Sequence, residues 1–255
     1  MSSTEEAVRN DRLWRGAYGQ MQSAGPVHRH MRRLLGEALS GLDYRTAVDV
    51  GCGAGDNAGL LRSGGDLERL VGVDVSGEAL ARARLQAPGE YRPLDIQADR
   101  VDEEFDLVFS SLLLEHLTDD RAALRNMRAM CRRWLVISTI AGDFDRYRAW
   151  DEQVGHVRNY ARGELERRLV EAGFEVVGAR YWGFPFYSPL ARVLQNHTRP
   201  SPEFGRATRL LAAALYRVYF LNSRRRGDLL IAVARPAQSE PAAARIESAI
   251  VRDGE

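Results

Sequence analysis

Short apolar runs alternate with segments of helical period over residues 46–139. Turn residues bound each run, and the five runs are Thr46–Val50, Leu70–Val75, Tyr91–Leu94, Phe105–Ser110 and Trp134–Thr139. Strands that alternate with helical segments along a chain are typical of a parallel sheet whose strands are joined by crossover helices. The pattern therefore predicts an α/β fold.

Local signals place helices and further strands around these runs. Ser76 precedes Gly77–Arg84, a stretch of good helix formers, and a serine at this position can cap a helix. A second helix is predicted over Ala161–Ala172, because Gly173 follows it in the position where helices commonly end. Two more strands are predicted, Glu175–Trp182 and Leu229–Ala234.

Three segments lie outside this alternation, namely residues 1–43, 140–160 and 184–226. We expect them to form a helical lid over the sheet. A chain of 255 residues with 45% hydrophobic residues can bury one sizeable core, so a single domain over residues 1–235 is expected. Residues 236–255 are rich in Pro, Ala, Ser and charge, which predicts a mobile tail or a loosely docked helix.

Charge and composition exclude several classes of function. The 36 basic and 35 acidic residues give a formal net charge of +1, so no global field attracts nucleic acid or an anionic membrane. Every basic residue is arginine, which excludes Schiff-base chemistry and a Walker-type lysine. Cys52 and Cys131 have no Cys or His neighbours at metal-ligand spacing, so we expect no metal. Without a signal-peptide pattern or a long apolar run, a soluble cytoplasmic protein is expected.

The first apolar run leads directly into the glycine-rich loop Gly51-Cys52-Gly53-Ala54-Gly55. Glycines let the backbone approach a ligand closely, and the helix that follows offers free N–H groups. A pyrophosphate fingerprint would require glycine at position 56, where this chain has Asp56. Asp74 ends the second run, about twenty residues further on, where a carboxylate can accept hydrogen bonds from both hydroxyls of a ribose. The pattern favours an adenosine-containing ligand without a pyrophosphate.

These motifs resemble those of the class I S-adenosylmethionine-dependent methyltransferases that act on small molecules. The resemblance runs from about Ala47 to Phe174, and four motifs carry it in the order of the family: Val50–Gly55, Gly72–Ser76, Leu94–Ile96 and Phe105–Leu117. It implies a Rossmann-like, seven-stranded, mostly parallel sheet with helices on both faces, whose last strand is antiparallel. It also implies S-adenosylmethionine as the cofactor.

The resemblance further implies which residues contact that cofactor. The glycine loop would lie under the methionine part, Asp74 would hold the ribose, and Asp95 with the Ile96 backbone would face the adenine. Asp95 has an alternative role as a solvated turn residue, and Asp49 either holds the cofactor's ammonium indirectly or only orients the loop. The expected cofactor contacts are Asp49, Gly51, Cys52, Gly53, Gly55, Asp74, Val75, Asp95, Ile96, Ser110 and Tyr18.

Two histidines are candidates for a proton-accepting base. A sulfonium donor leaves as a neutral thioether, so the protein must supply alignment and, for a hydroxyl acceptor, a base. His156 lies in a Gly-His-x-Arg-x-Tyr run that looks like those of bacterial small-molecule methyltransferases; alternatively it packs against the next helix, and Arg158 only pairs with an acid. His116 follows the fourth run, where it serves either as a base or as a packing residue. Trp14, Tyr18, His28 and His30 lie on predicted lid helices. Their side chains are expected either to close over the cofactor or to fill the core under the lid.

The expected function is methyl transfer to an oxygen, nitrogen or carbon of a small molecule, as a tailoring step of secondary metabolism. A cyclisation or rearrangement on the same fold is an alternative function.

A peripheral membrane or protein-interaction module is another alternative function, because Leu210–Leu221 is apolar and precedes Arg224–Arg226. Such a helix either lies on a membrane, covers a pocket or contacts a second copy. The aromatic run Tyr181–Tyr187 indicates an apolar or aromatic acceptor, or else core packing. No basic patch with interleaved aromatics indicates nucleic acid.

Overall fold

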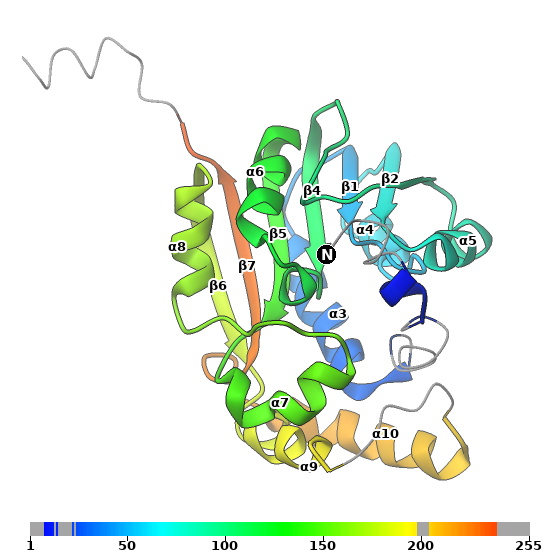
Figure 1. Ribbon diagram of the computed structural model, residues 1–255, viewed down its shortest axis with the longest axis vertical. Helices are drawn as coiled ribbons and strands as arrows, with labels where there is room; N and C mark the ends of the chain where they lie inside the picture. The colour runs from blue at the N-terminus through cyan, green and yellow to red at the C-terminus, as the bar shows by residue number, and fades with distance from the viewer. Residues whose placement is uncertain (1–7, 13, 15–21, 23, 198–203, 239–255) are drawn as a thin grey trace, which may run out of the picture.

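The computed structural model describes residues 8–12, 14, 22, 24–197 and 204–238, and a seven-stranded sheet forms its centre (Figure 1). The strand order is β3-β2-β1-β4-β5-β7-β6, and β7 runs antiparallel to both of its neighbours while β1 to β5 are parallel. The strands are β1 Thr46–Val50, β2 Arg69–Asp74, β3 Glu90–Pro93, β4 Phe105–Ser111, β5 Cys131–Ile140, β6 Phe174–Trp182 and β7 Leu229–Pro236. The predicted fold class is confirmed.

Helices connect the strands and extend beyond them. They are α3 Pro26–Leu39, α4 Ala58–Ser63, α5 Gly77–Gln86, α6 Asp120–Met130, α7 Phe144–Gln153, α8 Glu164–Glu171, α9 Arg192–Gln195 and α10 Arg206–Val218, with the short helices η2 Leu114–His116, η3 Phe186–Ala191 and η4 Tyr219–Leu221. The Ser76 side chain accepts a hydrogen bond from the backbone N–H of Ala79, so the predicted cap of α5 is confirmed. Gly173 follows α8 with a φ of 89°, as a helix-ending glycine does.

Two apolar layers enclose the sheet. On one face, Leu124 of α6 and Leu165 of α8 pack against Val48 and Val108. On the other face, Leu35 of α3 and Leu61 of α4 pack against residues of β1, β4 and β5. Because its apolar residues recur every three or four positions, α3 buries a continuous stripe in this layer. Residues 26–39 therefore belong to the core, which differs from the lid expected over the whole of residues 1–43.

The remaining helices gather at one end of the sheet. α7, α9 and α10 lie together beyond the carboxyl ends of the parallel strands, in the green, yellow and orange of Figure 1. They come from the segments 140–160 and 184–226, which the sequence sets apart from the strand and helix alternation. Among the described helices, none combines the length and the apolar character that a membrane crossing requires. This end of the sheet is where ligands bind in open α/β folds.

Candidate functional site

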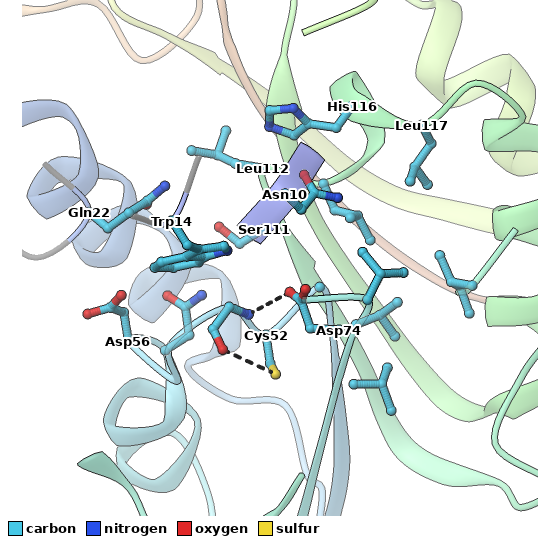
Figure 2. Close-up of a pocket in the computed structure, with 18 of the residues that line it drawn as sticks. Asn10, Trp14, Gln22, Cys52, Asp56, Asp74, Ser111, Leu112, His116 and Leu117 are labelled. Atoms are coloured by element: carbon cyan, nitrogen blue, oxygen red, sulfur yellow. Dashed lines mark hydrogen bonds between the residues drawn. The ribbon is translucent and has the colours of Figure 1, made fainter. Parts of the chain in front are cut away.

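A polar pocket of about 100 Å³ lies at the carboxyl ends of β1, β2 and β4; we call it the glycine-loop pocket (Figure 2). Its walls come from loops that follow four strands and from the N-terminal part of the chain. The lining residues include Gly51, Cys52, Gly53, Asp56, Asp74, Val75, Asp95, Ile96, Ser111, Leu112, Leu113 and His116, together with Asn10, Trp14, Gln22, Met31 and Arg32. The pocket is thus built mainly by the motifs that the sequence singles out.

The glycine loop has a backbone that other residues adopt poorly. Gly51 and Gly53 have φ values of 74° and 53°, in the region that side chains with a Cβ seldom occupy. A Cβ on Gly51 would lie 2.9 Å from a methyl carbon of Leu113, and one on Gly53 would lie 2.4 Å from the ring of Trp14. Both glycines therefore present bare backbone to the pocket.

Asp74 links the glycine loop to the start of α5. Its Oδ2 accepts a hydrogen bond from the Gly53 N–H at 2.9 Å (Figure 2), and its Oδ1 accepts one from the Ser76 N–H at 2.8 Å. Burial raises the pKa of Asp74, although these backbone N–H groups favour the ionised form. Each carboxylate oxygen can accept more than one hydrogen bond. Asp74 therefore keeps capacity for ligand hydroxyls while it orders the loop.

The described part of the N-terminus closes over this pocket. Asp11 Oδ1 accepts a hydrogen bond from Ser76 Oγ at 2.5 Å, and Arg82 donates one to the Trp14 carbonyl at 3.2 Å. Arg9 reaches across to donate to the Gly155 carbonyl at 3.3 Å. The Trp14 ring lies over the glycine loop (Figure 2). Residues 8–12 and 14 thus connect α5 with the loop that follows α7.

The charges in the pocket are of both signs. Arg32 stands opposite Asp56; burial raises the pKa of Asp56, and the Arg32 guanidinium opposes that rise. Beneath the loop, burial and the carboxylates of Asp74 and Asp56 raise the pKa of Asp49 to about 8. Asp49 Oδ1 has no hydrogen-bond partner among the described residues. One cation and several acids suit a ligand that carries a carboxylate, an ammonium and hydroxyl groups.

The structure brings most of the expected cofactor residues together. Asp49, Gly55 and Ser110 are the exceptions: Asp49 is buried below the loop, a Cβ on Gly55 would face Ala83, and Ser110 Oγ donates to the Val50 carbonyl at 2.9 Å. Ser111 lines the pocket in place of Ser110. Tyr18 lies outside the described residues. The expected residues that line the pocket are Gly51, Cys52, Gly53, Asp74, Val75, Asp95 and Ile96.

Sequence reasoning missed part of the lining. Arg32 and Met31 come from α3, whose amphipathic pattern marks a core helix but does not show which residues reach a pocket. Asp56 was used only to exclude a pyrophosphate fingerprint and was not predicted to line the pocket. Its position directly after the glycine loop could have indicated that it does.

A second, larger cavity of about 510 Å³ adjoins the glycine-loop pocket; we call it the apolar cavity. Among the described residues, it shares only Gln22, Leu112 and His116 with the first pocket. Leu112 has a φ of 53°, a left-handed value found at no other non-glycine residue in the described part of the chain. Residues that line the apolar cavity include Val27, His28, Ile140, Trp150, Val154, His156, Tyr187, Ala191, Leu194, Phe204, Leu211, Leu215, Tyr219 and Leu229.

Two histidine rings meet where the cavities adjoin. The rings of His116 and His156 lie 4.8 Å apart, centroid to centroid, and His116 Nδ1 lies 3.0 Å from the Gly155 carbonyl. Burial and the neighbouring His156 lower the pKa of His116 to about 3, so His116 is neutral at pH 7 and a weak base. His156 Nδ1 lies 3.2 Å from Asp151 Oδ1, an ion-pair distance without hydrogen-bond alignment.

Glu115 lies beside the two histidines. Its Oε2 accepts a hydrogen bond from Thr139 Oγ1 at 2.8 Å, and its buried Oε1 has no partner among the described residues. Burial raises the pKa of Glu115, which the neighbouring His156 opposes. Ligand atoms of Glu115, His116 and His156 lie within 4.8 Å of one another. The expectation that the chain uses no metal therefore stays a prediction.

A buried arginine holds Asp151 in place; we call this group the Arg192 cluster. Arg192 donates two hydrogen bonds to Asp151, at 3.0 and 2.8 Å, and one to Asp228 at 3.1 Å. Burial raises the pKa of Asp151, but His156 and Arg192 outweigh that effect and hold it below its usual value. Only 2% of the Arg192 side chain is exposed. The cluster joins α7, α9 and the residue before β7. Arg158 pairs with Asp120, as its alternative interpretation expects.

Comparison with known proteins finds a methyltransferase-like region in this chain. Residues 48–134 match the family profile described as a methyltransferase domain. The chain is 29% identical over 155 residues to trans-aconitate 2-methyltransferase of Azoarcus sp., an alignment that covers 60% of this chain and 59% of that protein. The matched residues therefore have the sequence pattern of a methyltransferase domain. A second relative, the ubiquinone biosynthesis O-methyltransferase of Alkalilimnicola ehrlichii, is 36% identical over 98 residues, or 35% of this chain and 38% of that protein.

Solved structures share the fold of this chain. The cyclase SpnF aligns with a TM-score of 0.61 at 19% identity, over 93% of this chain and 97% of that one. The magnesium protoporphyrin IX methyltransferase of Synechocystis, solved with bound S-adenosylhomocysteine, aligns with a TM-score of 0.60 at 15% identity, over 92% of this chain and 99% of that one. The chain spans 59% and 38% of the length of its two curated relatives. The solved structures establish the fold, and the site itself must support the activity.

Proposed function

We propose that this methyltransferase transfers a methyl group from S-adenosylmethionine to a small, largely apolar acceptor. One observation carries the proposal: a polar pocket around the glycine loop adjoins an apolar cavity of about 510 Å³, and the described residues that the two share are Gln22, Leu112 and His116. A donor and an acceptor bound on the two sides of this shared wall would meet there. Holding two reactants in contact lowers a barrier by roughly 7–11 kcal/mol.

The residues of the glycine-loop pocket fit the proposed cofactor. Bare backbone at Gly51 and Gly53 leaves room for close approach, and Asp74 has acceptor capacity for ribose hydroxyls. Arg32 would pair with the carboxylate of the methionine part, and Asp56 with its ammonium. When bound, the sulfonium group supplies an electrophilic methyl group and leaves as a neutral thioether.

The apolar cavity supports a lipophilic acceptor. Its walls are mostly aliphatic and aromatic side chains, and its described polar side chains include His28, His116 and His156. Burial and the charge of Arg32 lower the pKa of His28 to about 3, so this residue adds no charge at pH 7. A cavity of this kind favours an uncharged molecule with one reactive polar group, such as a hydroxyl.

We assign the proton-accepting role to His156. It lines the apolar cavity, and Asp151 lies behind its Nδ1, which leaves Nε2 as the nitrogen that would take a proton from the acceptor. Asp151 is a positioning residue, fixed in turn by Arg192. His116 is the weaker candidate, since its pKa of about 3 makes it a poor base at neutral pH.

Calorimetric titration with S-adenosylmethionine, S-adenosylhomocysteine and NAD tests the cofactor. The wild-type chain is expected to bind the first two and not NAD, and Asp74→Ala is expected to lose that binding. Asp99→Ala, a change at an exposed carboxylate outside the pocket, is the control. Equal binding of S-adenosylmethionine by Asp74→Ala and wild type would contradict the proposed site, and binding of NAD alone would overturn the proposal.

A cyclisation is the second candidate, because the cyclase SpnF shares the fold over 93% of this chain. Product mass separates the two reactions. Methyl transfer adds the mass of one CH₂ to the acceptor and produces S-adenosylhomocysteine, whereas a cyclisation leaves the mass of the substrate unchanged. The same assay with EDTA tests the prediction that no metal is required.

A further inference from the structure

Helix α10 is apolar on two opposite sides. Ala212 and Leu215 face inward and line the apolar cavity, together with Tyr219 of η4. A second apolar stripe faces solvent, with residues spaced three or four apart: Ala207, Leu210, Leu211, Ala214, Val218 and Leu221. A helix that only covers a pocket needs one apolar side. We call the second set the outer stripe of α10.

The outer stripe is strongly exposed. Leu210 is 74% exposed and Leu221 is 71% exposed. Leu194 of α9 is 68% exposed although it lines the apolar cavity, and Leu211 also combines exposure with cavity lining. Side chains that face both a cavity and solvent lie at its mouth. The mouth of the apolar cavity therefore lies beside the outer stripe, where α9 and α10 form the lower end of the molecule in Figure 1.

Arginines accompany the outer stripe. Between Phe204 and Gly227 the chain has six arginines, at positions 206, 209, 217, 224, 225 and 226, and no acidic residue. Arg217 is adjacent in sequence to Val218 of the stripe, and Arg225 and Arg226 follow η4. These three arginines form no ion pair within the described residues, whereas Arg224 pairs with Glu37. The concentration of positive charge is local, because the whole chain carries a net charge of only +1.

We propose that the outer stripe of α10 and its arginines bind the surface of an anionic lipid bilayer. Apolar side chains flanked by arginine are the pattern of helices that lie in a membrane interface, and each arginine near an anionic surface adds attraction. A two-fold contact with a second copy fits less well, because the same patch would face itself and bring like charges together. In combination with the proposed function, this surface lets the apolar cavity take its acceptor from the bilayer.

Co-sedimentation with vesicles tests the proposal without cofactor or acceptor. Vesicles of phosphatidylcholine with phosphatidylglycerol are expected to bind the full chain, and vesicles of phosphatidylcholine alone are expected to bind at least about tenfold less. Raising the salt concentration should weaken binding to the anionic vesicles, since salt screens the arginines. Because no methyl transfer is involved, this result is independent of the proposed reaction.

Matched variants locate the surface. Leu210→Ser with Leu221→Ser is expected to lower vesicle binding about tenfold or more, and Arg225→Glu with Arg226→Glu to lower binding to anionic vesicles similarly. Leu85→Ser on α5, where the leucine is 89% exposed, should leave binding unchanged. All these side chains are exposed, so the variants should fold. Absence of binding to anionic vesicles would overturn the proposal, as would a dimer that the leucine variant dissociates while vesicles bind nothing.

Discussion

The two cavities of this protein differ in how they are built. The glycine-loop pocket consists mainly of short loops at strand ends, with charges of both signs and backbone positions that only glycine suits. The apolar cavity consists of helices from segments inserted around the sheet, with aliphatic and aromatic walls. The glycine-loop pocket is thus formed by the sheet and its connecting loops, whereas the apolar cavity is formed by helices that lie outside the sheet. The cofactor side should therefore tolerate little change, while the acceptor side can vary without loss of the fold.

Removing the proposed base should have the largest effect. His156→Gln is expected to lower the rate of methyl transfer by about 10²–10⁴-fold, because the acceptor loses its proton acceptor. Binding of S-adenosylmethionine should stay the same, since His156 lines only the apolar cavity. Turnover is measured with a labelled methyl donor on an acceptor found by screening apolar hydroxyl compounds. His197→Gln, an exposed histidine outside both cavities, is the control; unchanged turnover in His156→Gln would remove the assigned role.

Breaking the Arg192 cluster tests whether the two cavities are independent. Arg192→Ala leaves the buried Asp151 without its main counter-ion, which is expected to lower the free energy of unfolding by about 3–5 kcal/mol. Urea denaturation measures this loss. In the fraction that stays folded, the affinity for S-adenosylmethionine should change little, because the cluster lies on the acceptor side. A collapse of cofactor affinity in the folded variant would show that the cavities are coupled.

A substitution in the glycine loop should lower the affinity of the glycine-loop pocket and leave the apolar cavity unchanged. Gly53→Ala forces a Cβ into a backbone of positive φ and toward the Trp14 ring, so the affinity for S-adenosylmethionine should fall about tenfold. Adding Trp14→Ala removes the ring and should recover part of that loss if the collision matters. Calorimetry measures both variants. Equal affinities of Gly53→Ala and wild type would contradict the close approach of the ligand to the loop.

The effect expected at Asp49 depends on pH. Its pKa is about 8 in the folded chain and 3.8 in the reference state, so the folded chain keeps a proton that the unfolded chain releases. Its stabilising contribution is complete below pH 3.8 and is lost as pH rises toward 8, by about 1.4 kcal/mol per pH unit. His28 and His116, with lowered pKa values of about 3, act in the opposite direction below pH 6.5.

The window between pH 6.5 and 8 therefore isolates Asp49 from these histidines. Across it, the free energy of unfolding of wild type should fall by about 2 kcal/mol more than that of Asp49→Asn. Denaturant titrations at several pH values measure the difference. Parallel curves for the two proteins would mean that Asp49 is ionised in the fold.

The glycine-loop pocket was largely predictable because its parts are local in sequence. Each strand ends in the residues that line the pocket, so Gly51, Gly53 and Asp74 could be placed from the strand pattern and the family resemblance. The wrong prediction for Ser110 has a local cause as well. Ser110 and Ser111 are neighbours on β4 whose side chains point to opposite faces, and a shift of one residue decides which of them reaches the pocket.

The apolar cavity was predictable only in outline. The sequence indicates extra segments over the sheet, but Asp151 pairs with Arg192, which comes from a different segment and meets it only in the fold. The start of strand β5 shows the same limit on a smaller scale. The strand begins at Cys131, but the predicted run begins three residues later, because the exposed Arg132 and Arg133 interrupt the apolar pattern. Pairing with β4 extends a strand that side-chain pattern alone would shorten.

The Arg192 cluster also bears on how such a protein can be recombined with its relatives. One guanidinium serves a carboxylate from the segment 140–160 and a carboxylate next to β7, while its own helix lies in the segment 184–226. A chimera that imports one of these segments without the other would bury a charge whose counter-ion has been left behind. The two insertions therefore form one exchangeable module, and a designer who wishes to graft a new acceptor site onto this domain should transplant them together.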